Sequence, residues 1–157
     1  MVGLTPTLRL ATIGERGQLK DMLGRYLTEL SSFGEVNHAY PWLDAYWQPG
    51  EARWPYLIEI AGALAGFALV NTHAPSGELV DYALAEFYVL PAARRGGVGR
   101  KAASAVLHRH PGTWELSAMR ANEPALRFWS AALDVAGAAA LRIIERDDIR
   151  IFRFAIG

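Results

Sequence analysis

The chain has 157 residues, the length of one ordinary domain with enough side chains to bury a hydrophobic core. Apolar residues make up 52% and charged residues 20%, a composition typical of globular proteins. The 16 basic and 16 acidic residues balance, so there is no basic excess of the kind that favours nucleic acid or a membrane surface. The absence of cysteine excludes disulfides, thiolate catalysis and cysteine-based metal sites.

Targeting and domain signals are also absent from the sequence pattern. Residues 1–12 lack a basic region followed by an apolar core, so we expect no secretory signal. The best apolar run, residues 61–70, is too short for a bilayer span and contains two glycines. No repeat, linker or low-complexity tract divides the chain. We therefore expect a soluble, cytoplasmic protein with a single domain over residues 1–157, and no pattern predicts a metal site.

The first third of the chain begins with a strand and a helix. Residues 7–13 alternate apolar and polar side chains, which predicts a half-buried strand. From Glu15 the apolar spacing changes to three and four, which predicts an amphipathic helix ending near Gly34. Its apolar stripe consists of Leu19, Met22, Leu23, Tyr26, Leu27 and Leu30. Residues 33–56 are aromatic and interrupted by proline and glycine, which indicates a loop with one short helix around residues 42–47.

The remaining two thirds alternate strands with two helices. The predicted strands are residues 56–61, 63–72, 79–90, 113–119, 140–145 and Ile149–Ile156. The predicted helices are residues 98–109 and a helix capped by Asn122 that runs to about residue 135. This order predicts an α/β (α+β) fold, in which helices flank a mixed, mostly antiparallel sheet of six to seven strands.

The most informative stretch is a basic, glycine-rich turn between a strand and a helix. Its residues are Arg94, Arg95, Gly96, Gly97, Val98, Gly99, Arg100 and Lys101. Such a turn presents successive backbone N–H groups at the positive end of a helix, and glycines let an anion approach the backbone closely. Four basic side chains add positive charge, so the turn predicts a diphosphate site. The simpler alternative is that the glycines only turn the chain and the basic side chains are solvated.

Two familiar phosphate-binding motifs do not fit this turn. No Gly-Lys-Ser/Thr follows, as a Walker motif requires. The glycine spacing also differs from the dinucleotide fingerprint, and the preceding strand does not open a βαβ unit. The residues themselves therefore predict phosphate binding without identifying the phosphate.

The pattern Arg94-x-x-Gly97-x-Gly99 resembles the Gln/Arg-x-x-Gly-x-Gly/Ala signature of the GNAT superfamily of acyl-CoA-dependent N-acyltransferases. One helix and one strand later, Asn122-Glu-Pro-Ala-Leu-Arg-Phe-Trp129 resembles that family's Asn-x-x-Ala-x-x-Phe-Tyr. The order of strands and helices is similar along nearly the whole chain. The resemblance implies a GNAT-like fold, acetyl-CoA as co-substrate and an amine as acceptor.

The resemblance also implies residue roles. Backbone groups of Phe87, Tyr88 and Val89 are expected to bind the pantetheine arm, and the turn to hold the pyrophosphate. The expected cofactor-binding residues are Phe87, Tyr88, Val89, Arg94, Arg95, Gly96, Gly97, Val98, Gly99, Arg100, Lys101, Asn122 and Phe128. For Asn122 the alternative is a helix cap alone, and Phe128 is expected to be at least partly core.

Glu86 is the expected catalytic base, because it is the acidic residue in the middle of the strand that precedes the turn. The alternative is a solvated residue on the outer strand face. A backbone N–H near Tyr88 or Val89 is the expected oxyanion donor. The general acid is open: Trp129 stands where many relatives have tyrosine, and an indole is no usable proton donor. One alternative is that Tyr88 or another tyrosine replaces it. The other, which we prefer, is that the thiolate leaves without an acid, because a thiol pKa is only about 8.5.

The acceptor site is expected in residues 33–56, where Glu35, Asp44 or Glu51 would pair with a cationic amine. The alternative is that these aromatics form a satellite core, and His38 is not expected to be catalytic. The expected acceptor is a small-molecule or peptide amine, with no nucleic-acid or membrane partner, and a homodimer is plausible by resemblance.

Two other functions fit the sequence less well. One is a non-catalytic acetyl-CoA sensor with the same fold, because the base is unproven and the usual tyrosine is missing. The other is a nucleic-acid-binding protein that uses the basic turn, which the zero net charge opposes.

Overall fold

A computed structural model describes residues 5–157 and contains one seven-stranded sheet with helices on both faces. The strands are β1 Thr7–Leu10, β2 Trp54–Ile60, β3 Ala63–Asn71, β4 Tyr82–Val89, β5 Gly112–Met119, β6 Ala139–Arg146 and β7 Ile149–Ile156. The α-helices are α1 Arg16–Leu30, α2 Val98–His108 and α3 Glu123–Val135, and short 3-10 helices are η1 Ile13–Glu15, η2 Leu43–Trp47 and η3 Pro91–Ala93. The first four residues, which belong to the segment expected to lack a secretory signal, lie outside the described part.

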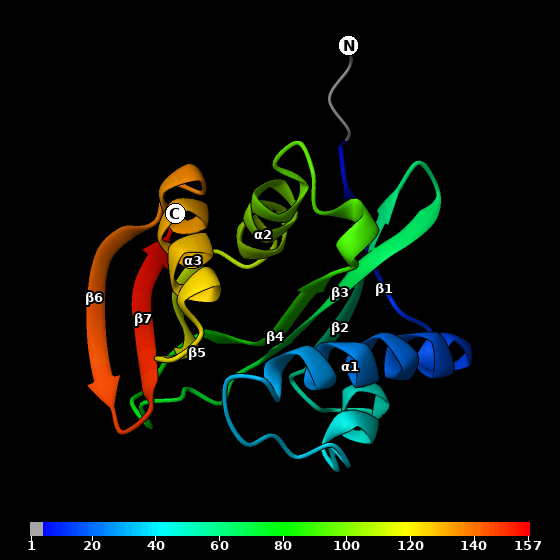
Figure 1. Ribbon diagram of the computed structural model, residues 1–157, viewed down its shortest axis with the longest axis horizontal. Coiled ribbons are helices and arrows are strands. Elements are labelled where there is room, and N and C mark those ends of the chain that lie inside the picture. The colour runs from blue at the N-terminus through cyan, green and yellow to red at the C-terminus, as the bar shows by residue number, and fades with distance from the viewer. Residues whose placement is uncertain (1–4) are drawn as a thin grey trace.

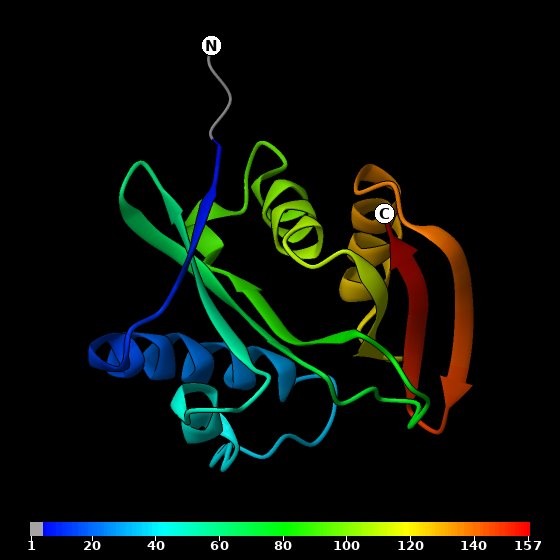
Figure 2. The same cartoon turned by 180° about the vertical axis from the view of Figure 1, so that it is seen from behind.

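The strand order is β1-β2-β3-β4-β5-β7-β6. Every neighbouring pair is antiparallel except β4 and β5, which are parallel. Figure 2 shows β1 toward one end of the sheet and the β6–β7 hairpin at the other. The predicted mixed, mostly antiparallel α/β fold is confirmed.

Two hydrophobic cores lie on opposite faces of this sheet. Helix α1 covers one face, and helices α2 and α3 cover the other (Figure 1). The α2–α3 core contains the fully buried Trp114 of β5. The α1 core contains Phe67 of β3 and also Tyr40, Leu43 and Tyr46 from the aromatic segment. That segment therefore supplies core, as the satellite-core alternative predicted.

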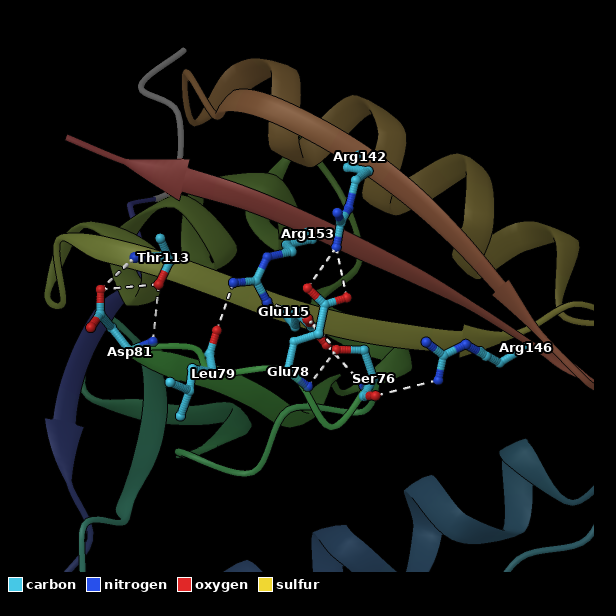
Figure 3. A network of polar contacts seen from close by, with 9 residues as sticks. All are labelled: Ser76, Glu78, Leu79, Asp81, Thr113, Glu115, Arg142, Arg146 and Arg153. Carbon is cyan, nitrogen blue, oxygen red and sulfur yellow. Dashed lines mark hydrogen bonds and ion pairs between the residues drawn. The ribbon is translucent and has the colours of Figure 1, made fainter.

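Two strands, β1 and β4, are at least three residues shorter than the sequence pattern predicts. β1 ends at Leu10 rather than residue 13, because residues 13–15 turn into η1 and Glu15 accepts a hydrogen bond from the Thr12 backbone at 3.0 Å. β4 begins at Tyr82 rather than residue 79, because the preceding loop is held by side chains of other strands. Arg153 of β7 donates to the Leu79 carbonyl at 2.6 Å (Figure 3). In both cases side-chain contacts outside the strand shorten it: β1 ends earlier and β4 begins later than local alternation suggests.

Among residues 5–157, no helix combines the length and the apolar character that a bilayer crossing needs.

Candidate functional site

The site begins where β4 and β5 separate. Their parallel pairing covers only Tyr82 to Leu84 on β4, whereas β4 continues beside β3 as far as Val89. A parallel ladder that stops halfway leaves one edge of the longer strand without its neighbour. The second half of β4 therefore faces a slot rather than a strand.

A pocket of about 550 Å³ occupies this slot between α1 and α3. β4 and the glycine-rich turn complete its wall. It is lined by Tyr26, Glu29, Leu30, Phe33, Phe87, Tyr88, Val89, Arg94, Gly97, Val98, Gly99, Arg100, Asn122, Pro124, Ala125, Phe128 and Trp129. Ten of these residues are among the expected cofactor-binding set. The two sequence motifs therefore meet at one cavity, although a whole helix and strand separate them in the chain.

The glycine-rich turn has the backbone conformation that an anion site requires. Gly96 and Gly97 have φ values of 66° and 73°, which disfavour any residue with a Cβ, and Gly97 is the N-cap of α2. The N–H groups of the first turn of α2 have no partner within the helix, and Gly99 and Arg100 of this turn line the pocket. The Val98 N–H already donates to the Arg95 carbonyl at 3.3 Å. Gly99 is needed for packing as well, because a Cβ there would lie 2.9 Å from Phe128.

Arg94 has a different environment from the other basic residues of the turn. Its Nε donates to the Val89 carbonyl at 2.7 Å, and its guanidinium pairs with Glu29 of α1 at 2.9 Å. The Tyr88 hydroxyl also donates to Glu29 at 2.8 Å. Arg94 thus joins β4, the turn and α1, a role that the sequence did not indicate. These bonds engage the Arg94 side chain and the Val89 carbonyl before any ligand is present.

Asn122, Phe128 and Trp129 bring α3 to the pocket. Asn122 caps α3 by accepting from the Ala125 backbone at 3.2 Å, and it also lines the pocket, so the cap alternative and the pocket position both hold. Phe128 stacks on Phe87 with ring centroids 5.8 Å apart. Trp129 is 7% exposed and packs edge-on against Phe87. The tryptophan therefore combines a core position with a place in the pocket wall.

Glu86 lies on the α1 face of the sheet because of a bulge in β4. Leu69 pairs with Glu86 but the next residue, Val70, pairs with Leu84, so Ala85 is an extra residue in β4. In a regular strand without the bulge, Leu84 and Glu86 are two residues apart and would point to the same face, toward α2 and α3. The bulge turns the carboxylate toward α1, where the Tyr26 and Tyr40 hydroxyls donate to its two oxygens at 2.9 and 2.7 Å.

The environment of Glu86 raises the affinity of its carboxylate for a proton. Burial raises the pKa of Glu86 above its ordinary value, although the hydrogen bonds from Tyr40 and Tyr26 oppose this rise. Among residues 5–157 no cation forms an ion pair with this carboxylate. A partly buried carboxylate without a cationic partner has an increased affinity for a proton, which is what a general base needs.

Several expected residues lie outside the pocket wall. Arg95, Gly96 and Lys101 are exposed on the turn, and Glu86 lies behind Tyr26 rather than in the wall. The acidic acceptor candidates are elsewhere: Asp44 pairs with Arg16, Glu51 lies near Arg53, and Glu35 and His38 are exposed away from the wall. Of residues 33–56, the segment expected to bind the acceptor, only Phe33 reaches this pocket among the described residues.

The α1 side of the pocket was missed by the sequence analysis. Tyr26, Glu29, Leu30 and Phe33 recur at spacings of three, one and three, the pattern of one helix face that continues past the end of α1. Tyr26 and Leu30 were predicted only as part of the apolar stripe. Glu29 was a usable signal for this wall, because its carboxylate lies at the edge of the apolar stripe, three residues after Tyr26.

A second hollow of about 640 Å³ adjoins the first, because Phe33 lines both. Its other walls come from the end of β5, the start of α3 and the β6–β7 turn. Within residues 5–157, no group of three or more histidine, aspartate or glutamate side chains is arranged to hold a metal ion.

Comparisons with known proteins agree with this geometry. A model of the acetyltransferase (GNAT) family matches residues 20–134. The fold is similar to that of a GNAT-family acetyltransferase from Bacillus cereus ATCC 10987, with a TM-score of 0.68, 16% identity, and coverage of 98% of this chain and 99% of that one. A GNAT-family acetyltransferase from Staphylococcus aureus MU50 gives a TM-score of 0.69 at 13% identity, covering 98% of this chain and 100% of that one.

A third similar structure holds ligands. AAC(6')-Ib in complex with parmomycin and acetyl-CoA has a TM-score of 0.64 at 18% identity, covering 97% of this chain and 93% of that one. At such low identities the likeness concerns the fold alone. A search of curated proteins found no significant sequence match.

Proposed function

This chain belongs to the acetyltransferase (GNAT) family, and from that premise we propose that it binds acetyl-CoA in the pocket between α1 and α3 and transfers the acetyl group to an amine. The observation that carries the proposal is the pocket itself. It joins the open edge of β4, the positive end of α2 and the two motifs of the sequence in one cavity.

The chemistry of the wall fits the two ends of acetyl-CoA. The α2 N-terminus, with Arg100 in the wall and Arg95 exposed beside it, suits a pyrophosphate. The edge of β4 that has no β5 neighbour suits an extended, amide-bearing arm, which would add to the sheet like a strand. Because the Val89 carbonyl already accepts from Arg94, Phe87 and Tyr88 are the better backbone partners for that arm.

Acetyl-CoA would supply an activated thioester, and the chain would supply proton transfer and charge stabilisation. Glu86, whose pKa burial raises, is the proposed base for the amine. A backbone N–H of the second half of β4 is the proposed oxyanion donor. The thiolate leaves without a dedicated acid: burial, together with Glu29, raises the pKa of Tyr88 to about 12, and its hydroxyl already donates to Glu29.

The amine acceptor would approach from the side of Phe33, where the second hollow adjoins the pocket. The parmomycin bound to AAC(6')-Ib illustrates that this fold can accept a bulky amine. The acceptor class proposed for this chain is a small-molecule or peptide amine. A cytoplasmic location, a homodimer and the single domain over residues 1–157 stay predictions.

The first test is thermal unfolding with and without acetyl-CoA, with free CoA and ATP as controls. A ligand at about one hundred times its Kd stabilises the native state by about 2.7 kcal/mol, which raises Tm by several degrees. We expect a shift with both CoA species and none with ATP. No shift with any of them contradicts the proposed pocket.

The location of the pyrophosphate is tested with a matched pair of arginines. Arg100→Ala removes a cation from the pocket wall and should weaken acetyl-CoA binding by about tenfold, the effect of one charge-assisted hydrogen bond. Arg127→Ala removes an exposed arginine of α3 that lies outside the wall and should leave binding unchanged. Acetyl-CoA binding without thiol release in the presence of amines would favour the sensor alternative.

A further inference from the structure

Glu86 reaches the pocket only through another side chain. Its two carboxylate oxygens accept from Tyr26 and Tyr40, and among the described residues the pocket wall includes Tyr26 but neither Glu86 nor Tyr40. We propose that the Tyr26 hydroxyl contacts the attacking amine and relays its proton to Glu86, and that Tyr40 positions the carboxylate. This inference rests on the proposed acetyl transfer and names a catalytic residue for it.

Tyr26 is held in place for this role. Its ring packs against Phe67 and Tyr88, with centroid distances of 5.8 and 5.6 Å. Its hydroxyl donates to Oε1 of Glu86 at 2.9 Å. A phenolic hydroxyl accepts as well as donates, so the oxygen that donates to Glu86 can also accept from an amine N–H. Because Glu86 lies in the half of β4 that β5 does not pair with, this bond also places the Tyr26 oxygen beside the part of β4 that borders the slot.

Tyr40 donates to the other oxygen of the Glu86 carboxylate. It is 9% exposed, comes from the segment between α1 and η2, and donates to Oε2 of Glu86. Its φ value of 41° is unusual for an aromatic residue, and such a conformation persists only where surrounding contacts hold it. Because Tyr40 does not reach the pocket wall, it can orient Glu86 but cannot touch the acceptor.

The step balances without any further reactant. The ammonium group of the acceptor gives a proton to the Tyr26 oxygen as the Tyr26 proton moves to Glu86. The freed nitrogen lone pair then attacks the thioester carbonyl, the C–S bond breaks, and the sulfur leaves as thiolate. Tyr26 never has to ionise, which matters because burial and the Glu86 charge raise the pKa of Tyr26 well above its ordinary value. Glu86 ends protonated and loses its proton to solvent when the products leave.

The test compares Tyr26→Phe with Tyr40→Phe, because each variant removes one hydroxyl donor from the same carboxylate. Thiol release from acetyl-CoA is followed with n-butylamine, tyramine and parmomycin as acceptors across a range of pH. We expect Tyr26→Phe to lower kcat by about 10²-fold or more, the usual contribution of a positioned proton acceptor, with the KM for acetyl-CoA little changed. Glu86→Gln should give a loss of similar size.

Tyr40→Phe should behave differently. It keeps the relay, so turnover above the acid limb should stay within about tenfold of wild type. Its acid limb should move to higher pH, because the hydrogen bond from Tyr40 lowers the pKa of Glu86. The double variant Tyr26→Phe with Glu86→Gln should be no slower than either single variant, since both residues act on one proton.

A measurement without turnover checks the contact itself. Titration of the Glu86 carboxyl by ¹³C NMR in the free protein should show a higher pKa in both tyrosine variants, since each hydroxyl lowers it. A raised pKa of Glu86 in both variants together with a much larger loss of kcat in Tyr26→Phe identifies the relay rather than general damage. Tyr56→Phe, which removes a hydroxyl on the opposite face of the sheet, should change neither quantity.

The inference and the proposed function fail in different ways. If wild type releases thiol but Tyr26→Phe is no slower than Tyr40→Phe, Glu86 acts directly or through water and the relay is wrong. If wild type binds acetyl-CoA but releases no thiol with any of the amines, acetyl transfer to amines is wrong and the relay falls with it.

Discussion

His110 lies in an aromatic environment that disfavours its charged form. Its Nε2 is 2.7 Å from the Tyr56 hydroxyl, and its ring lies 4.8 and 4.7 Å from the rings of Trp54 and Tyr82. Its carbonyl accepts from the Trp114 indole at 2.8 Å. Burial, followed by the charge of Arg109, lowers the pKa of His110 below its ordinary value. The native state therefore holds this histidine neutral where the unfolded chain would already bind a proton.

This difference makes stability depend on pH at a single residue. Because the native pKa is depressed, the stability is fully present above the ordinary pKa of about 6.5 and is lost as the pH falls from there toward the native value. We expect His110→Gln to flatten the dependence of Tm on pH between about 5 and 7 relative to wild type. The other histidines are present in both wild type and His110→Gln, so their contributions to the pH dependence of Tm cancel in the comparison. Parallel Tm profiles for the two proteins would contradict the assignment.

The β3–β4 ladder is the element on which the pocket depends, and it tolerates no side chain at Gly66. An added Cβ there would lie 2.0 Å from the Tyr88 carbonyl oxygen, and Gly66 pairs directly with Val89. Both neighbours are backbone groups, which cannot turn away as a side chain can. The second half of β4 keeps its position because this point of contact is made by backbone alone.

We expect Gly66→Ala to lower the free energy of unfolding by about 3 kcal/mol or more, since relief of the clash requires the two strands to separate. Gly24→Ala is the matched control, because Gly24 lies within α1 and an added Cβ would meet nothing within 4 Å. It should raise stability by about 0.5–1 kcal/mol through helix propensity. Urea unfolding measures the free energy of unfolding of both variants. Equal changes for Gly66→Ala and Gly24→Ala would show that β3 and β4 are not tightly packed at Gly66.

At the scale of the whole molecule, a buried carboxylate joins three distant parts of the chain. Glu115 of β5 is 0% exposed and accepts from the backbone and hydroxyl of Ser76 and from Arg153 of β7 (Figure 3). Arg153 also donates to the Leu79 carbonyl. The loop before β4 is thereby fastened to the half of the sheet beyond the slot.

Arg153→Met should cost about 3–5 kcal/mol in the free energy of unfolding, because it leaves Glu115 as a buried charge without its cation. Arg142→Ala removes the exposed pair with Glu78, whose side chains are 55% and 46% exposed, and should cost at most about 1 kcal/mol. Chemical denaturation at neutral pH compares the two. If Arg153→Met lowers the free energy of unfolding no more than Arg142→Ala does, water stabilises the charge of Glu115 in place of the arginine.

The features that the sequence predicted correctly are local ones. The stripe of α1, the cap at Asn122 and the glycine-rich turn before α2 depend on residues within a few positions of one another, so their spacing carries the information. The order of strands and helices along the chain was also predicted, because each strand has its own alternating pattern and turn residues. From the sequence alone, these patterns predicted the α/β fold and a phosphate site at the turn, and the two motifs added a resemblance to one family.

The tertiary structure decided which side chains meet at the site. Tyr26 and Glu86 are 60 residues apart, and no local period couples them. The face on which Glu86 lies depends on one extra residue in β4, since a shift of one residue reverses every side chain of a strand. Arg94 meets Glu29, and Glu115 is buried despite its charge, because partners from other elements arrive there. Sequence determines local geometry through short-range sterics and periodicity, whereas contacts between distant elements follow from register and packing, which only the folded chain specifies.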